Sequence, residues 1–315
     1  MTIHSSGSEI SLSQINADFA LGTSLSSYRG VTWYKNDFTT GTFPYSELGM
    51  SQFYDKRNTS PGPSVNVTYV GAASVYKVGS DTVIEWTSSG TMTFSGSLYC
   101  QAVTLGGGGG GGGASNDRSG GGGAGGIDFN TYNFYGGWNI SIGAGGPGAP
   151  KPSRGVPEAS GTGGSNTSVI NQVNGTGLVA YGGGGGSRGY GNYGFSATGG
   201  SSGNGFAGGA DGGGGGGAGG RAVDAAGYNA SPGGPGYTAN ITGSNVVYGG
   251  GGGGGAGAGA GGSGGGGDAA GYNGTGLPGA NGLGGGGGGS GGYGGGGAGG
   301  SGRFIIRGYF NAIAG

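Results

Sequence analysis

In LYCQAVTLGGGGGGGG, residues 98–113, eight mostly apolar residues are followed directly by eight glycines. The apolar side chains of Leu98, Cys100 and Ala102 recur at every second position, a spacing that predicts a β-strand. A second apolar segment, Phe304 to Phe310, follows the last glycine run. We expect these two strands to pair, so that the glycine-rich chain between them leaves and returns at one place.

Glycine supplies 100 of the 315 residues, against about 7% in an average protein. This composition excludes an ordinary globular domain. It also excludes collagen, whose helix needs glycine at every third position and abundant proline, because here glycine forms unbroken runs and the chain has 10 prolines.

A glycine-rich segment is by default a flexible linker, but three features of this one favour order. Serine is not the partner residue inside the runs, tyrosine and other apolar residues recur between them, and strands bracket the whole segment. Polyglycine also forms extended threefold helices, which pack side by side and pair their N–H and C=O groups with neighbouring helices. Such pairing would replace a hydrophobic core.

The expected fold class is mostly β with polyglycine II, preceded by a small N-terminal α/β region. A short helix is predicted within Glu9–Phe19, and apolar residues at every second position from Val65 onward predict three or four short antiparallel strands. The expected domains are a virion attachment or oligomerisation region at 1–60, a β-strand region at 61–105, a glycine-rich domain with display loops at 106–302, and a closing strand at 303–315.

Charge and composition argue against several functions. The net charge is −1 and seven Lys or Arg follow residue 105, too few to bind a nucleic acid. A single His, His4, and a single Cys, Cys100, give no basis for a catalytic dyad, a zinc site or an internal disulfide. We expect no enzymatic activity, no cofactor and no metal. Asp211 and Asp268 lie beside glycine runs but do not fit the calcium-binding repeat, so we interpret them as solvated loop residues.

Two motifs stand out between the runs. The hexapeptide Asp224–Asn229 recurs at 268–273, which indicates a repeated unit of run and loop. The segment Arg188 to Phe195 combines Arg, Gly, Tyr and Asn, as RNA-binding tails do and as protein binding loops do. The low positive charge argues against RNA, so we interpret this segment as a recognition loop, with a purely structural turn as the alternative.

The strand that enters polyglycine, Thr91–Leu105, and the closing Gly302–Arg307 resemble the glycine-rich domain of bacteriophage tail fibre and tail tip proteins. The glycine runs resemble those of the distal adhesins of T-even-like phages, whose polyglycine helices form a sandwich that displays variable receptor-binding loops. The segment from Ser11 to Gly30, with Phe53–Arg57, is similar to a short N-terminal segment that recurs in phage virion proteins. The strand-rich region before the glycine domain departs from the T-even-like adhesins, so their mode of attachment is not carried over.

The resemblance implies a phage tail adhesin in the virion tail that binds a bacterial surface receptor, an outer-membrane protein or a glycan, without catalysis. Its other partners would be tail proteins or sister chains. The alternative is a purely structural tail or fibre protein with a rigid glycine-rich spacer. An ice-binding protein would need regularly spaced Thr or small residues on one flat face, and a cell-wall protein a signal peptide; we expect neither from this sequence.

If the runs alternate in direction from Leu105, their far end receives the loops 114–119, 187–207 and 268–283. The expected receptor-binding residues are the aromatic and polar side chains of these loops: Tyr190, Tyr193, Phe195, Asn116, Arg118, Tyr272 and Asn273. We expect the aromatic loop to contribute most, because aromatic anchors commonly dominate binding energy.

Overall fold

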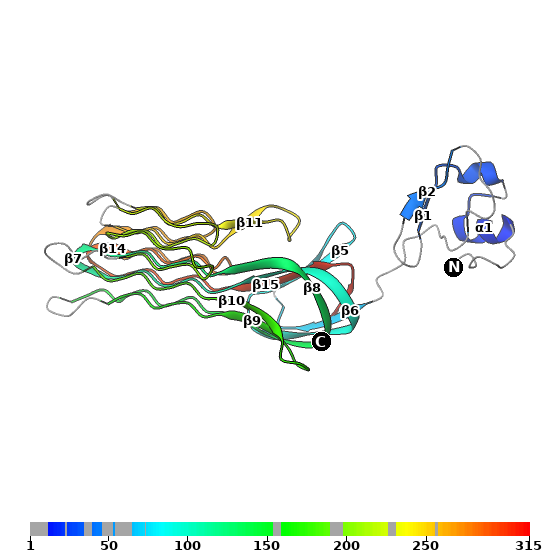
Figure 1. Cartoon of the computed structure of the whole chain (residues 1–315). Coiled ribbons are helices and arrows are strands. Elements are labelled where there is room, and N and C mark those ends of the chain that lie inside the picture. The colour runs from blue at the N-terminus through cyan, green and yellow to red at the C-terminus, as the bar shows by residue number, and fades with distance from the viewer. Residues whose placement is uncertain are drawn as a thin grey trace. The chain divides into compact units, whose positions relative to one another are not determined.

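The computed structural model describes residues 12–22, 24–34, 40–45, 53, 65–72, 74–153, 159–189, 198–225, 231–255 and 258–315. The chain forms two compact units, Met1–Ser64 and Val65–Gly315 (Figure 1). Within the described ranges, no helix is long and apolar enough to cross a membrane.

The first unit has a small aromatic core. Its elements are α1 (Leu12–Phe19), a 3-10 turn (Leu25–Tyr28) and the antiparallel pair β1 (Thr32–Tyr34) and β2 (Thr40–Thr42). Helix α1 lies within the segment predicted to be helical. Ile15 and Phe19, four residues apart on one helix face, are buried against the rings of Tyr28, Phe43 and Phe53. Tyr28 and Phe53 pack edge to face with ring centroids 5.3 Å apart.

The second unit is built on one curved sheet, the main sheet, with strand order β10-β9-β8-β6-β15-β5-β4; β3 pairs with β6, and β16 with β3. Its strands are β3 (Asn66–Val70), β4 (Ser74–Val78), β5 (Asp81–Trp86), β6 (Gly90–Leu105), β8 (Ile127–Ser141), β9 (Thr167–Asn171), β10 (Gly177–Ala180), β15 (Arg303–Gly308) and β16 (Asn311–Ala314). The pairs are antiparallel except β16 with β3. The glycine-rich part of the sequence therefore supplies β8, β9 and β10 to this sheet.

The two strands that bracket the glycine-rich segment pair as predicted. β6 and β15 run antiparallel, with Leu105 opposite Arg303 and Val103 opposite Ile305, so the chain leaves and re-enters the main sheet at adjacent positions. The sequence predicted short strands on either side of Gly96. Instead β6 is one strand of 16 residues with an irregular register between Phe94 and Leu98, because a bulge lets a strand continue past such a point.

Successive side chains of a strand point to opposite faces, and each face of the main sheet carries a cluster of buried apolar side chains. On one face, Trp86 and Phe304 are fully buried with ring centroids 5.5 Å apart. On the other, Val83, Val103 and Ile305 are buried against the hairpin of β11 (Tyr237–Ala239) and β12 (Val246–Tyr248).

The glycine runs lie side by side in a layer, the glycine layer, that extends from the main sheet (Figure 1). In the run 106–113, every third N–H group donates to the same neighbouring segment. The donor and acceptor pairs are Gly106 to Gly126, Gly109 to Gly123 and Gly112 to Gly120; Gly107 to Ser165, Gly110 to Thr162 and Gly113 to Ala159; and Gly108 to Gly300 and Gly111 to Gly297. This run thus donates to three neighbours with the three-residue period expected of a threefold helix. The polyglycine II conformation itself stays a prediction.

The interior of the glycine layer has no room for a side chain at these contacts. A Cβ atom on Gly252 would lie 2.0 Å from the carbonyl oxygen of Gly287, and one on Gly109 would lie 2.1 Å from that of Gly184. Both distances are far inside van der Waals contact. Glycine is therefore required by close backbone approach.

The glycine layer has a proximal end at the main sheet and a distal end away from it. The β11–β12 hairpin lies at the proximal end (Figure 1). At the distal end, β7 (Ala114–Arg118), β13 (Ala270–Tyr272) and β14 (Ser290–Gly294) form a separate sheet, the distal sheet.

Candidate functional site

The distal sheet joins two parts of the chain that are far apart in the sequence, β7 on one side and β13 with β14 on the other. β14 lies in the middle, antiparallel to β7 and parallel to β13. Gly291 of β14 pairs with Arg118 on one side and with Tyr272 on the other. The end of the glycine layer is thus a place where side chains from distant loops come together.

Two buried serines hold the distal sheet together, and one of them, Ser119, also bonds to a glycine run. The Ser119 hydroxyl donates to the carbonyl oxygen of Gly112 over 2.6 Å and accepts the N–H of Ser290 over 2.7 Å. The Ser290 hydroxyl donates to the carbonyl oxygen of Gly294 over 2.8 Å. These bonds pair polar groups whose burial without a partner would cost free energy.

Tyr272 is the most exposed aromatic side chain that the structure describes in this sheet, at 66%. Its ring lies against the backbone of Gly292, where an added Cβ would be 2.5 Å from a ring carbon. The next residue, Asn273, has a φ of +62° and accepts the N–H of Tyr293 with its side-chain oxygen over 3.3 Å. Lys151 Nζ donates to the Asn273 carbonyl oxygen over 3.3 Å. The loop therefore holds Tyr272 on a backbone platform, open to solvent.

The distal sheet contains, or directly adjoins, four of the residues predicted to bind a receptor: Asn116 and Arg118 in β7, Tyr272 in β13, and Asn273 just after it. The side chain of Arg118 lies against the turn at Gly212, where an added Cβ would be 2.7 Å from Arg118 Cδ. The aromatic residues Tyr190, Tyr193 and Phe195 lie outside the described residues. Their loop begins beside the distal sheet, because Gly189 forms a bridge with Ala114.

Two of the loops predicted at the far end, 187–207 and 268–283, lie only partly at the distal end. Asn204 binds Ile127 at the main sheet, and Leu283 packs into the apolar cluster under the β11–β12 hairpin. The loops 187–207 and 268–283 therefore reach the proximal end with their last residues. The reason is that their Gly, Ser and Ala segments join the layer as further runs, as when the N–H of Gly200 donates to Gly121.

The first residue of the repeated hexapeptide, an aspartate, makes a backbone hydrogen bond in both copies. Asp224 accepts the N–H of Ala210 over 3.0 Å, and Asp268 accepts the N–H of Gly261 over 2.7 Å. Each carboxylate thus ties its own segment to an earlier part of the layer. In the part of the chain that the structure describes, no three His, Cys, Asp or Glu side chains are grouped to hold a metal.

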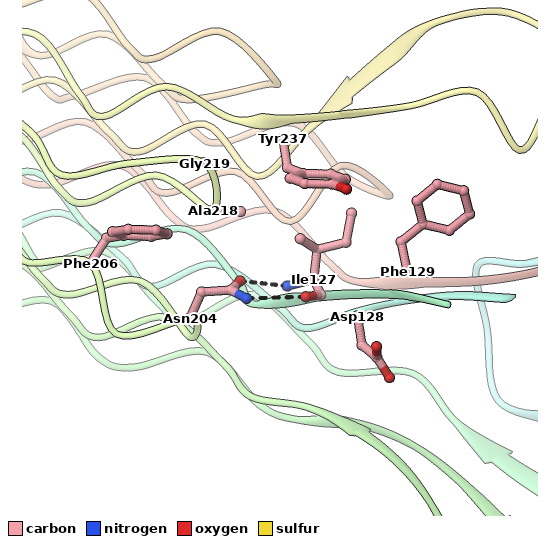
Figure 2. Close-up of a pocket in the computed structure, with 8 residues that line it drawn as sticks. All are labelled: Ile127, Asp128, Phe129, Asn204, Phe206, Ala218, Gly219 and Tyr237. Atoms are coloured by element: carbon pink, nitrogen blue, oxygen red, sulfur yellow. Dashed lines mark hydrogen bonds between the residues drawn. The ribbon is translucent and has the colours of Figure 1, made fainter. Parts of the chain in front are cut away.

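A cleft opens at the proximal end, between the start of β8 and the start of β11 (Figure 2). Its volume is about 460 Å³, and its lining residues are Ile127, Asp128, Phe129, Asn204, Phe206, Ala218, Gly219 and Tyr237. Ile127 and Phe129 project toward Tyr237, whereas Asp128 points to the opposite side of the strand (Figure 2). Phe206 and Tyr237 are 39% and 41% exposed, so the cleft presents aromatic surface to solvent.

Polar contacts fix the floor of this cleft. The Asn204 side-chain oxygen accepts the N–H of Ile127 over 2.7 Å, and its amide nitrogen donates to the Ile127 carbonyl oxygen over 3.1 Å. The amide therefore takes the place of a neighbouring strand at this edge. On the opposite side of β8, the Tyr132 hydroxyl donates to the Asp128 carboxylate. Burial, reinforced by this hydrogen bond and by the charge of Asp128, raises the pKa of Tyr132.

Sequence reasoning missed this cleft. Its local signal was the apolar pair Ile127 and Phe129 directly after a glycine run. The other walls come from distant segments, since Asn204 is 77 residues from Ile127. Only the folding of the runs brings them together.

The fold and its two exposed sites define a class: a mostly β, glycine-rich protein in which a sheet continues into a layer of glycine runs. Residues 87–309, most of the chain, match the glycine-rich domain family, and the chain belongs to this family. No curated protein matches the chain.

Proposed function

We propose that the chain is a bacteriophage tail adhesin that binds a receptor on the bacterial surface through the distal end of its glycine layer, without catalysis. The observation that carries the proposal is the distal sheet, which brings β7 beside β13 and β14 from a distant part of the sequence, at the end of a layer in which most glycine positions leave no room for a Cβ atom. Such a layer leaves the loops as the place where sequence can vary. Rigid aromatic and small polar residues in loops are typical of binding surfaces.

The likeness of the sequence to phage proteins supplies the second support. The strand that enters polyglycine and the closing strand are the parts that resemble phage tail fibre proteins, and these two strands pair in the main sheet. The receptor of this proposal is an outer-membrane protein or a glycan.

The first unit serves as the attachment region in this proposal. It has its own aromatic core, so a separate role is physically reasonable. Its partner would be another tail protein or a sister chain in the virion tail. Deleting residues 1–64 from the phage-encoded chain should release the glycine-rich unit from particles while leaving that unit folded. Retention of the truncated chain on virions would contradict this role.

The alternative is a purely structural tail protein in which the glycine layer is a rigid spacer. The observation that favours it is the network of backbone hydrogen bonds that links the glycine runs of the layer. The two functions differ in whether the purified chain competes with phage for cells.

The test is an adsorption competition with the full-length chain and cells that the parent phage infects. An adhesin should block adsorption, and Tyr272→Ala, or Tyr190→Ala combined with Tyr193→Ala, should weaken that block about tenfold or more. Tyr181→Ala is the matched control, because Tyr181 is 62% exposed but lies at the proximal end, where its carbonyl oxygen accepts the N–H of Gly126. No competition by the wild-type chain would favour the spacer.

A further inference from the structure

We propose that the cleft between β8 and β11 binds a neutral saccharide, at a site separate from the distal sheet. This inference does not depend on the proposed receptor site. It rests on the shape, the charge and the backbone bonding of the cleft.

The shape of the cleft suits a ring with one apolar face. Its volume of about 460 Å³ lies within the ~300–1,000 Å³ usual for small-molecule sites. Phe129 and Tyr237 lie on its two sides and Phe206 closes one end (Figure 2). Aromatic rings supply flat apolar surface, and a tyrosine hydroxyl adds a polar group at the edge. A sugar ring has the complementary surface, with C–H groups on its faces and hydroxyls around its rim.

The charge of the cleft selects a neutral ligand. None of the eight lining residues is Lys, Arg or His, so the walls offer no cation to a phosphate, sulfate or carboxylate group. The one charged lining residue, Asp128, points away from the cleft and accepts the Tyr132 hydroxyl. An anionic sugar would therefore lose its hydration without gaining a partner.

The backbone bonding argues against an extended peptide. A peptide adds to a sheet by pairing with the N–H and C=O groups of an edge strand. At Ile127 both groups are already bonded to the Asn204 side chain. Four residues further on, the N–H of Thr131 donates to the side-chain oxygen of Asn130. Both bonds close positions that strand addition would need.

Polar side chains continue the same face beyond the cleft. Thr131 follows Phe129 at the next outward position of β8, and it pairs with Gln101 of β6. Both are exposed. A chain of two or more sugars seated against Phe129 would reach their hydroxyl and amide groups. We therefore expect oligosaccharides to bind more tightly than monosaccharides.

The test is a binding screen with the full-length chain and immobilised neutral oligosaccharides of hexoses, 6-deoxyhexoses and N-acetylhexosamines. Sialylated and sulfated oligosaccharides and extended peptides form the comparison arms. The best neutral oligosaccharide is then titrated by calorimetry. We expect Phe206→Ala and Tyr237→Ala each to weaken its binding about tenfold or more, and Tyr237→Phe, which keeps the ring, to weaken it less.

The controls separate this site from the distal one. Tyr99→Ala removes a side chain that is 73% exposed on the main sheet and should leave binding unchanged, as should Tyr272→Ala. Thermal melting checks that each variant is folded. Loss of binding in Tyr272→Ala with retention in Phe206→Ala would move the saccharide to the distal sheet. Binding of only the charged or peptide probes, or no neutral binding at millimolar concentration, would overturn the proposal.

Discussion

The main sheet and the glycine layer both bury backbone, but they pair and pack it in different ways. In the main sheet, backbone groups pair with strands on two sides, and large side chains fill the space on both faces, such as Phe304 on one face and Ile305 on the other. In the glycine layer, the run 106–113 donates to three neighbouring segments, and the space that side chains would fill is taken by other backbones. A buried interior therefore needs paired polar groups and close packing, and large apolar side chains are only one way to achieve the packing.

The largest effect is expected where a side chain is forced into the glycine layer. In Gly252→Ala the new Cβ would lie 2.0 Å from the carbonyl oxygen of Gly287. Because the obstacle is backbone that is itself hydrogen-bonded, we expect a loss of about 4 kcal/mol or more of unfolding free energy, which is exceptional for one methyl group. Urea unfolding followed by circular dichroism measures it.

Gly271→Ala is the matched control for that variant. A Cβ at Gly271 meets nothing within 4 Å, so this substitution should change the unfolding free energy by less than about 1 kcal/mol. Equal stability of the two variants would show that the layer yields easily, and the contrast with the main sheet would fail.

The main sheet should respond to lost volume instead. Phe304→Ala removes a fully buried ring and should cost about 3–5 kcal/mol, whereas Phe304→Leu should cost less than about 1.5 kcal/mol. Chemical denaturation of both variants gives the two values. If the two substitutions cost the same, packing volume would not be what holds this sheet.

A smaller effect is expected where the two regions meet. Asn204→Ala removes two hydrogen bonds to the backbone of Ile127, at about 1 kcal/mol each, so about 2 kcal/mol should be lost. Asn240→Ala in the exposed hairpin turn is the control. Calorimetry measures the melting temperature of both variants. Equal melting temperatures would contradict this role of Asn204.

The smallest effect is a loss of unfolding free energy at alkaline pH, and it comes from a buried thiol of the main sheet. Burial raises the pKa of the Cys100 thiol from 9 to about 12. The folded state therefore favours the protonated thiol, and its contribution is complete below pH 9 and falls as pH rises toward 12. Wild type should lose about 1.4 kcal/mol more than Cys100→Ala between pH 8 and pH 10. Urea titrations at the two pH values test this, and equal losses would show that Cys100 does not titrate in that way.

The sequence predicted the parts of the fold that have strong local signals. The strand that enters polyglycine and the strand that follows it were predicted to pair from their positions alone, and β6 and β15 do pair, although the register that sets Leu105 opposite Arg303 was not predicted. Alternation of loops along the runs placed Arg118 and Tyr272 at one end, and the two residues do lie in one sheet. Whether that sheet binds a receptor stays a prediction.

The long strand β8 and the cleft were out of reach for a physical reason. The outward residues of β8 include Thr131, Asn133 and Tyr135, and Gly136 and Gly137 interrupt the alternation. A polar strand that contains glycines shows no clear alternation of apolar and polar residues in the sequence. The cleft in turn depends on Asn204 and Tyr237, which reach β8 only through the path of the runs.

The three-residue period of the glycine layer restricts how such a gene can change in length. Deleting three residues from the run 106–113 and three from its partner 119–126 preserves the pairing of Gly106 with Gly126 and of Gly109 with Gly123. Deleting one or two residues turns the remaining N–H groups toward the wrong neighbours. Viable length variants should therefore differ by multiples of three codons within the runs. Each step of three residues changes the length of the layer by roughly 9 Å for an extended threefold helix. The loops at its end can change by any number of codons.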